Sequence, residues 1–166
     1  MQKRLIAFVP GKKTGYAVFE INRNINLLFY GSFPFEDYSA VGTIIDLFEK
    51  YKPIICVVED QYLSNNFDSV KKLIEQKSAI SSLAYILGAK VYRIHPKTWQ
   101  ANVLKNFGFN IFTGKQNLKK YSKKVCALLY DIANTSSDDV SNAILIGHYV
   151  ASKILIEQVL TQKNKN

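Results

Sequence analysis

Residues 7–18 read AFVPGKKTGYAV, an apolar run that bends at a Pro-Gly pair and continues as a second apolar run after a Thr-Gly pair. Runs of this composition separated by a short turn are typical of adjacent antiparallel strands. Two lysines and small residues occupy the bend, which suits a backbone that meets an anionic group. Val9, however, ends the first run where a polar side chain would be expected to face the bend.

The elements around this stretch predict an α/β fold. Strands are expected at residues 4–9, 15–21, 25–33, 54–59 and 90–94, and helices from 37 or 39 to 51, then at 68–87, 97–104, 115–130 and 137–160, with an aromatic loop at 106–114. This order gives a five-stranded mixed sheet, in which a three-strand antiparallel meander and two further strands are flanked by helices. It is the ribonuclease H-like topology. We expect one domain over residues 1–161 and a frayed polar tail at 162–166.

The composition is that of a soluble globular protein. Of the 166 residues, 48% are hydrophobic and 21% are charged, which argues against disorder. No apolar run approaches the roughly 20 residues that span a bilayer, so no membrane association is expected. No signal-peptide pattern follows the first residues, and we therefore expect a cytoplasmic location. Cys56 and Cys126 lie among apolar neighbours and are expected to be buried thiols rather than zinc ligands.

The positive charge is concentrated in one third of the chain. The net charge is +9, and no acidic residue occurs between Glu75 and Asp131. That stretch carries ten basic residues: Lys77, Lys90, Arg93, Lys97, Lys105, Lys115, Lys119, Lys120, Lys123 and Lys124. Like charges repel unless a polyanion is present at times, so this distribution favours nucleic acid as a partner over a merely solvated surface.

Acidic residues fall at two places where ligands gather in such a sheet. Glu59 ends the expected fourth strand, at the carboxyl edge of the sheet. Asp138 and Asp139 begin the last helix, and Asn142 shares their face one turn later. Alone, Ser137 or either aspartate could cap the helix, and Glu59 could be a solvated strand end. Together they are the kind of residues that hold two Mg²⁺ ions about 4 Å apart for phosphodiester hydrolysis.

Four segments resemble the motifs of the RuvC family of Holliday junction resolvases, particularly its short phage and bacterial members. They are AFVPGKKTGYAV at 7–18, VVEDQYLSNNFDSVKKL at 57–73, YRIHPKTWQ at 92–100 and SSDDVSNAILIG at 136–147. Their order matches the family and they span nearly the whole chain. The resemblance implies a homodimeric endodeoxyribonuclease that binds branched DNA at four-way junctions and uses Mg²⁺, or Mn²⁺, for hydrolysis.

The resemblance also implies roles for individual residues. The metal-binding positions are Glu59, Asp139 and Asn142, and the catalytic candidates are Glu59, Asp138, Asp139, Lys119 and Lys120. Val9 stands where the family has its first-strand aspartate, and Asn142 where it has its last. Valine cannot ligate a metal and an amide is a weaker ligand, so the site charge falls from about −4 to about −2. Asp138 is the nearest carboxylate that could replace the one missing at position 142, because it shares the face of Asn142. Asp60 cannot do so, because it alternates to the other side of its strand.

DNA contacts are expected from lysines and from one aromatic residue. The candidates are Lys12, Lys13, Tyr62, Asn66, Lys97, Lys115, Lys119, Lys120, Lys123 and Lys124. By resemblance Tyr62 inserts at the junction centre, although a packing tyrosine is an equal alternative. Lys115, Lys119 and Lys120 are equal candidates for the scissile phosphate. The helix at 68–87 has enough apolar residues for a core face and a homodimer interface.

Three functions remain open on the sequence. The first is an active resolvase with a rearranged site that uses Glu59, Asp138 and Asp139. The second is a catalytically impaired protein that binds junctions without cutting them. The third is a resolvase-derived subunit that binds only other proteins, and the basic third of the chain speaks against it.

Overall fold

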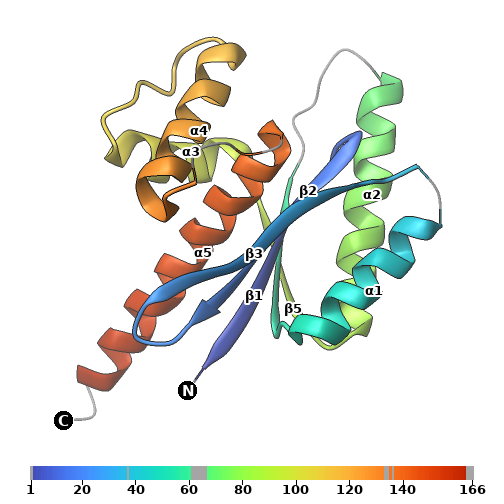
Figure 1. The fold of residues 1–166 in the computed structure, drawn as a ribbon, viewed down its shortest axis with the longest axis horizontal. Helices are drawn as coiled ribbons and strands as arrows, with labels where there is room; N and C mark the ends of the chain where they lie inside the picture. The colour runs from blue at the N-terminus through green and yellow to red at the C-terminus, as the bar shows by residue number, and fades with distance from the viewer. Residues whose placement is uncertain (1, 37, 61–66, 133–134, 136, 164–166) are drawn as a thin grey trace.

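The computed structural model describes residues 2–36, 38–60, 67–132, 135 and 137–163. The chain runs through β1 (Lys3–Val9), β2 (Lys13–Ile21), β3 (Ile25–Pro34), α1 (Ser39–Tyr51), β4 (Ile55–Glu59), α2 (Phe67–Ile86), β5 (Lys90–Ile94), α3 (Pro96–Asn106), α4 (Lys115–Tyr130) and α5 (Asp138–Lys163), as Figure 1 shows. The elements expected from the sequence are therefore present, and most of their ends lie within one or two residues of the expected positions.

The five strands form one mixed sheet in the order β3-β2-β1-β4-β5. β1 pairs antiparallel with β2, and β2 pairs antiparallel with β3. β4 runs parallel to both β1 and β5. The predicted meander with two added strands is confirmed. Because β1 and β4 are parallel neighbours, Val9 and Glu59 at their carboxyl ends lie on the same edge of the sheet.

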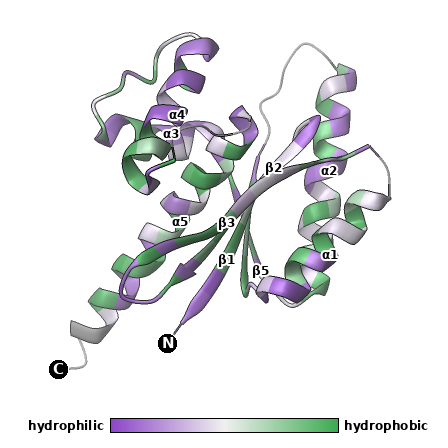
Figure 2. Cartoon of the chain, in the orientation of Figure 1, coloured by the Kyte–Doolittle hydropathy of each residue, from purple (hydrophilic) through white to green (hydrophobic). Residues whose placement is uncertain are grey.

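Helices cover both faces of the sheet, with α1 and α2 on one side and α3, α4 and α5 on the other (Figure 1). Side chains of β1 alternate between the two layers, as the period of a strand requires. Leu5, Ala7 and Val9 belong to the core beneath α5, whereas Ile6 and Phe8 belong to the core beneath α1 and α2. The strands are accordingly hydrophobic along their centres, as the colouring of Figure 2 shows.

Gly15 allows α5 to lie directly on the sheet. A Cβ atom added at Gly15 would stand 2.3 Å from the carbonyl oxygen of Asp139 and 2.6 Å from the amide nitrogen of Val140. No side chain fits between β2 and the first turn of α5 at this point. The Thr-Gly pair of the opening stretch thus fixes the position at which α5 begins, and with it the positions of Asp139 and Asn142.

The helix ends differ from expectation at the start of α1 and at the end of α5. The N-cap of α1 is Tyr38, which makes no capping hydrogen bond through its side chain; Ser39 is the first helical residue, and Asp37 lies outside the described residues. The start of α5 agrees with expectation: Ser137 caps it, because its Oγ accepts a hydrogen bond from the amide of Val140 at 3.2 Å. α5 continues to Lys163, two residues into the segment expected to be a tail.

α5 is long and apolar enough, by length and composition, to cross a membrane between Asp138 and Thr161. No such run is expected from the sequence. Its apolar residues Ala143, Ile144 and Ile146 are fully buried in the core formed with the sheet. The apolar character of α5 is therefore explained by its packing on the sheet.

Candidate nucleic-acid interface

An open cleft of about 1880 Å³ lies at the carboxyl edge of β1 and β4. Its wall is formed by residues of the β1–β2 turn, α2, α3, α4 and α5. Val9, Glu59, Asp139 and Asn142 all line it. The four positions at which the sequence places the metal site are thus brought to one cleft.

Glu59 is held in a mainly apolar setting at the end of β4. Its side chain is buried, and its Oε1 accepts a hydrogen bond of 2.8 Å from the indole nitrogen of Trp99 on α3. Burial raises the pKa of Glu59 to about 7, and the nearby charge of Asp139 adds to this rise. The hydrogen bond from Trp99 acts in the opposite direction because it stabilises the carboxylate.

Asp139 lies against the turn between β1 and β2. A Cβ atom added at Gly11 would stand 2.7 Å from its Oδ2, so the carboxylate rests on the backbone of the Pro-Gly bend. Burial raises the pKa of Asp139 to about 6, and the charge of Asp138 adds to the rise. Lys119 and Lys115 lower it in part, which places their positive charges near this carboxylate.

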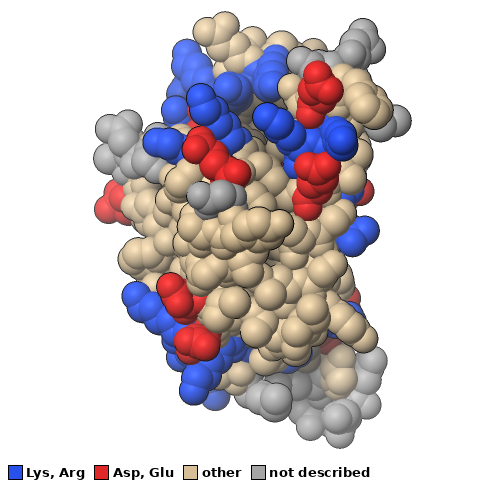
Figure 3. Space-filling view, turned by 90° about the vertical axis from the view of Figure 1, so that its right-hand side faces the viewer, with Lys and Arg blue, Asp and Glu red and all other residues tan. Residues whose placement is uncertain are grey.

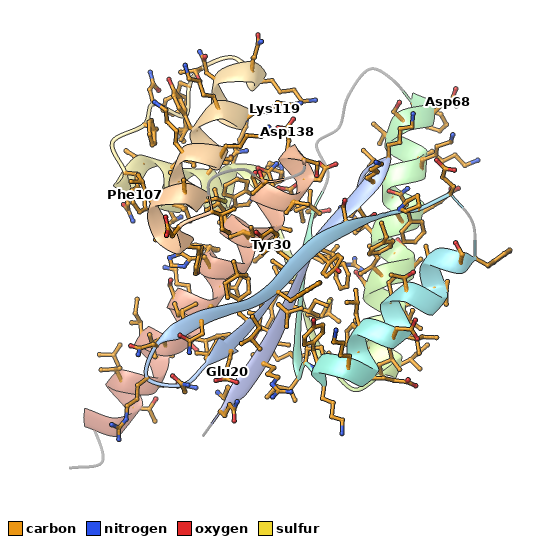
Figure 4. All side chains as sticks on the ribbon, in the orientation of Figure 1. Glu20, Tyr30, Asp68, Phe107, Lys119 and Asp138 are labelled. Atoms are coloured by element: carbon orange, nitrogen blue, oxygen red, sulfur yellow. The ribbon has the colours of Figure 1, made fainter. Side chains whose placement is uncertain are left out.

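Asp138 is occupied by two lysines of α4. Its Oδ2 lies 2.6 Å from the Nζ of Lys119, and its Oδ1 lies 3.2 Å from the Nζ of Lys123. Figure 4 shows Lys119 and Asp138 side by side where α4 meets the start of α5. Its hydrogen bond to Lys119 is the largest cause that lowers the pKa of Asp138. Asp138 is therefore charged and paired.

The donor set of the cleft does not fit two Mg²⁺ ions. Such ions take several carboxylate oxygens, commonly shared between them. Val9 is 1% exposed, packs in the core beneath α5 and offers no oxygen. Asp60 pairs with Lys77 of α2, on the other side of the sheet, as its alternation predicts. Within the described part of the chain, no group of three or more His, Cys, Asp and Glu side chains is arranged to hold a metal ion.

The predicted lysines divide into two groups. Lys12, Lys97, Lys115 and Lys119 line the cleft, from the β1–β2 turn, α3 and α4. Lys13, Lys120, Lys123 and Lys124 lie outside its lining. Tyr62 and Asn66 belong to residues 61–66, outside the described residues, so their roles stay predictions.

Three residues of the cleft lining are not singled out from the sequence: Tyr38, Lys72 and Phe112. Trp99, which is fully buried, is a fourth residue of this region that the sequence does not single out. Lys72 of α2 is a fifth lysine in the lining, opposite the lysines of α4. The lining also contains five carboxylates, which include Glu36 and Glu75. Trp99 supplies the hydrogen bond to Glu59. The aromatic loop at 106–114 was the one sequence signal that pointed towards Phe112.

The arrangement of strands and helices is that of the RuvC-type Holliday junction resolvases, a ribonuclease H-like fold. RuvC of Thermus thermophilus in complex with a Holliday junction superimposes with a TM-score of 0.70 at 13% identity, over 94% of this chain and 96% of that one. The fowlpox virus resolvase in complex with Holliday junction DNA gives 0.67 at 20% identity, over 92% and 99%. The yeast mitochondrial Holliday junction resolvase Ydc2 gives 0.64 at 11% identity, over 94% and 82%.

Sequence comparison adds nothing to this structural likeness. No protein-family model matches the chain, and no curated protein matches it in sequence. At 11–20% identity the structural neighbours establish the fold, which confirms the predicted fold class and the resolvase-type topology.

Proposed function

We propose that this protein binds four-way DNA junctions in the cleft and does not cut them by a two-metal mechanism. The observation that carries the proposal is the composition of the cleft, in which lysines of four structural segments surround a site that has Val9 in place of a carboxylate. The fold supports a branched-DNA ligand, because two of its structural neighbours are complexes with Holliday junctions. The net charge of +9 supports a polyanionic ligand.

An active resolvase with a rearranged site is the competing function. It would need Asp138 as a metal ligand beside Glu59 and Asp139. Asp138 would have to leave Lys119 and Lys123 first, and the pair with Lys119 spans only 2.6 Å. The geometry therefore favours binding without cleavage.

One experiment separates the two functions. The protein is incubated with a labelled four-way junction and with a linear duplex of the same length, in Mg²⁺, in Mn²⁺ and in EDTA, and both retardation and nicking are measured. We expect tighter binding to the junction than to the duplex in each of the three buffers, and no nicking over hours. Nicking that depends on Mg²⁺ or Mn²⁺ would establish the active enzyme, and equal binding to duplex and junction would refute junction recognition.

Replacing Lys115 is expected to weaken the binding of DNA in a salt-dependent way. Lys115 lines the cleft, and each phosphate that a lysine neutralises adds roughly 0.9 to the slope of log affinity against log salt. The K115A variant should therefore bind more weakly at low salt, with a slope reduced by about 1. Fluorescence anisotropy over a salt series measures this slope.

The matched control is K124A, because Lys124 is exposed on the same helix but lies outside the cleft lining. We expect K124A to keep the slope of the natural chain. Equal losses in both variants would mean that the whole basic surface of α4, rather than the cleft, binds the DNA.

We further propose that two copies associate through α2. The face formed by α1 and α2 carries a broad area without charged side chains, as Figure 3 shows. On α2, Ile74 is 42% exposed, and Tyr85 and Ile86 are each 76% exposed. Apolar residues exposed along one helix are typical of an interaction surface, and the predicted homodimer uses this helix.

An I86E variant should remain a monomer at concentrations at which the natural chain forms dimers, because a charge would be buried without a partner. Sedimentation velocity measures the two states. I156E is the matched control, since Ile156 is 55% exposed on α5. Dissociation by I156E and not by I86E would place the interface on α5.

A further inference from the structure

Phe112 is an exposed aromatic residue on a loop that is held in place. It lies between α3 and α4, and its side chain is 90% exposed. The loop is anchored on one side by Phe109, whose ring stacks on that of Tyr121 at 4.5 Å between centroids. Close to Phe112 itself, the side chain of Asn110 accepts a hydrogen bond of 2.9 Å from the Phe112 amide. The loop therefore presents one large apolar ring to the solvent in a defined position.

Phe112 belongs to the lining of the cleft described above. Phe112 lines it together with Lys115 and Lys119 of α4, and Tyr38, 93% exposed, lines the cleft from the start of α1. Removing apolar surface from water is favourable in free energy. A ligand that covers the exposed ring of Phe112 would therefore be bound more tightly. Aromatic rings beside lysines that contact phosphates are the usual means of binding unpaired bases, which stack on the rings.

We propose that Phe112 stacks on a base that is exposed at the branch point of the bound junction. The inference rests on the proposed function, because it assumes that branched DNA occupies the cleft. Within a linear duplex both faces of each base are covered by its neighbours. At a branch point the stacking is interrupted, so a ring can cover an open base face there. Phe112 therefore contributes to the choice of junction over duplex, while the lysines contribute to both.

The test compares the affinities of variants for a four-way junction and for a linear duplex, measured by fluorescence anisotropy at fixed salt. F112A should lower the affinity for the junction roughly 5- to 150-fold, the range for one stacked base, and leave that for the duplex unchanged. F112W should retain junction binding, and F112L should lose it, because leucine keeps apolar volume but has no ring. The thermal midpoint should not change, since the side chain is almost fully exposed.

Two controls sharpen the result. Phe107 is 39% exposed on the same loop but is absent from the cleft lining, and Figure 4 shows it at the outer edge of the molecule, beside α3 and α4. F107A should therefore bind the junction like the natural chain. On a junction that lacks the bases at its branch point, the natural chain should bind as weakly as F112A, with no further loss in the variant.

The outcomes separate this inference from the proposed function. If the natural chain does not prefer the junction to the duplex, the proposed function fails and the role of Phe112 fails with it. If it prefers the junction and F112A binds both DNAs like the natural chain, the stacking role alone is overturned. An equal loss on junction and duplex also overturns it, because the contact then is not to an open base.

Discussion

A V9D/N142D double variant is expected to bind Mn²⁺ or Mg²⁺ and to nick four-way junctions, whereas the natural chain does neither. Val9 and Asn142 line the same cleft as Glu59 and Asp139, so the two changes place four carboxylates at these positions in one cleft. Hard divalent cations bind such oxygen-rich sites, whose charge the change raises from about −2 to about −4. Isothermal titration with Mn²⁺ and a junction-nicking assay measure the two gains.

The stability of the double variant should depend strongly on the cation. Val9 is 1% exposed, and an aspartate there is buried in the same cleft as the other three carboxylates. In EDTA we expect a loss of about 3 kcal/mol or more, since an unpaired buried charge carries a penalty of this size. A cation at 100 times its Kd should restore about 2.7 kcal/mol, because it binds only the folded state. Thermal unfolding in EDTA and in Mn²⁺ measures both effects.

A V9N/N142D variant is the matched control, because asparagine has the shape of aspartate without its charge. It should bind Mn²⁺ more weakly than V9D/N142D does, and it should not nick the junction. If the natural chain already shows a thermal shift in Mn²⁺ as large as that of V9D/N142D, its cleft holds the cation without the first-strand carboxylate, and the proposed lack of two-metal chemistry is wrong.

The fold could be predicted because its signals are local. The near-continuous apolar run before Glu59 indicated a strand covered on both faces, and Val57 and Val58 are indeed fully buried. The Pro-Gly bend separated two strands that pair in register from Val9–Gly15 to Lys3–Ile21. α4 was predicted with the bounds it has, Lys115–Tyr130. Each of these inferences needed only the spacing of apolar residues, or a turn, within one segment of the sequence.

The contents of the cleft could be predicted only in part, because they depend on side chains that approach from distant segments. Glu59 and Asp139 were identified by their positions at element ends. The pair of Asp138 with Lys119, and the hydrogen bond from Trp99 to Glu59, join residues 19 and 40 positions apart, and no period in the sequence indicates them. The exposure of Phe112 likewise depends on tertiary packing, because its loop neighbours Phe109 and Ile111 pack against the core and Phe112 does not.

A G15A variant is expected to lose about 3 kcal/mol or more of its free energy of unfolding. The added methyl group would stand 2.3 Å from the backbone of Asp139, much closer than such atoms approach in folded proteins. Backbone cannot rotate away as a flexible side chain can, so α5 must lift from β2 or β2 must bend. For a chain of this length the loss corresponds to a fall of about 6–12 °C in Tm, measurable by circular dichroism.

Gly42 provides a control with the same chemical change and the opposite expected sign. It lies inside α1, and nothing stands within 4 Å of the Cβ that alanine would add. Alanine favours helix over glycine by up to about 1 kcal/mol, so G42A should unfold at a slightly higher temperature. If G15A were as stable as G42A, α5 would not lie this close to β2.

The contrast between Gly15 and Val9 explains why the opening stretch keeps its turn residues although the residue before the turn is apolar. Gly15 meets the backbone of α5, and Gly11 meets the carboxylate of Asp139. These are demands of packing, which hold whether or not a cation is bound. A carboxylate at position 9 would instead be a buried charge that only a cation or a proton could compensate. Without that compensation valine is the more stable choice, so this stretch can keep its fold while it no longer supports two-metal chemistry.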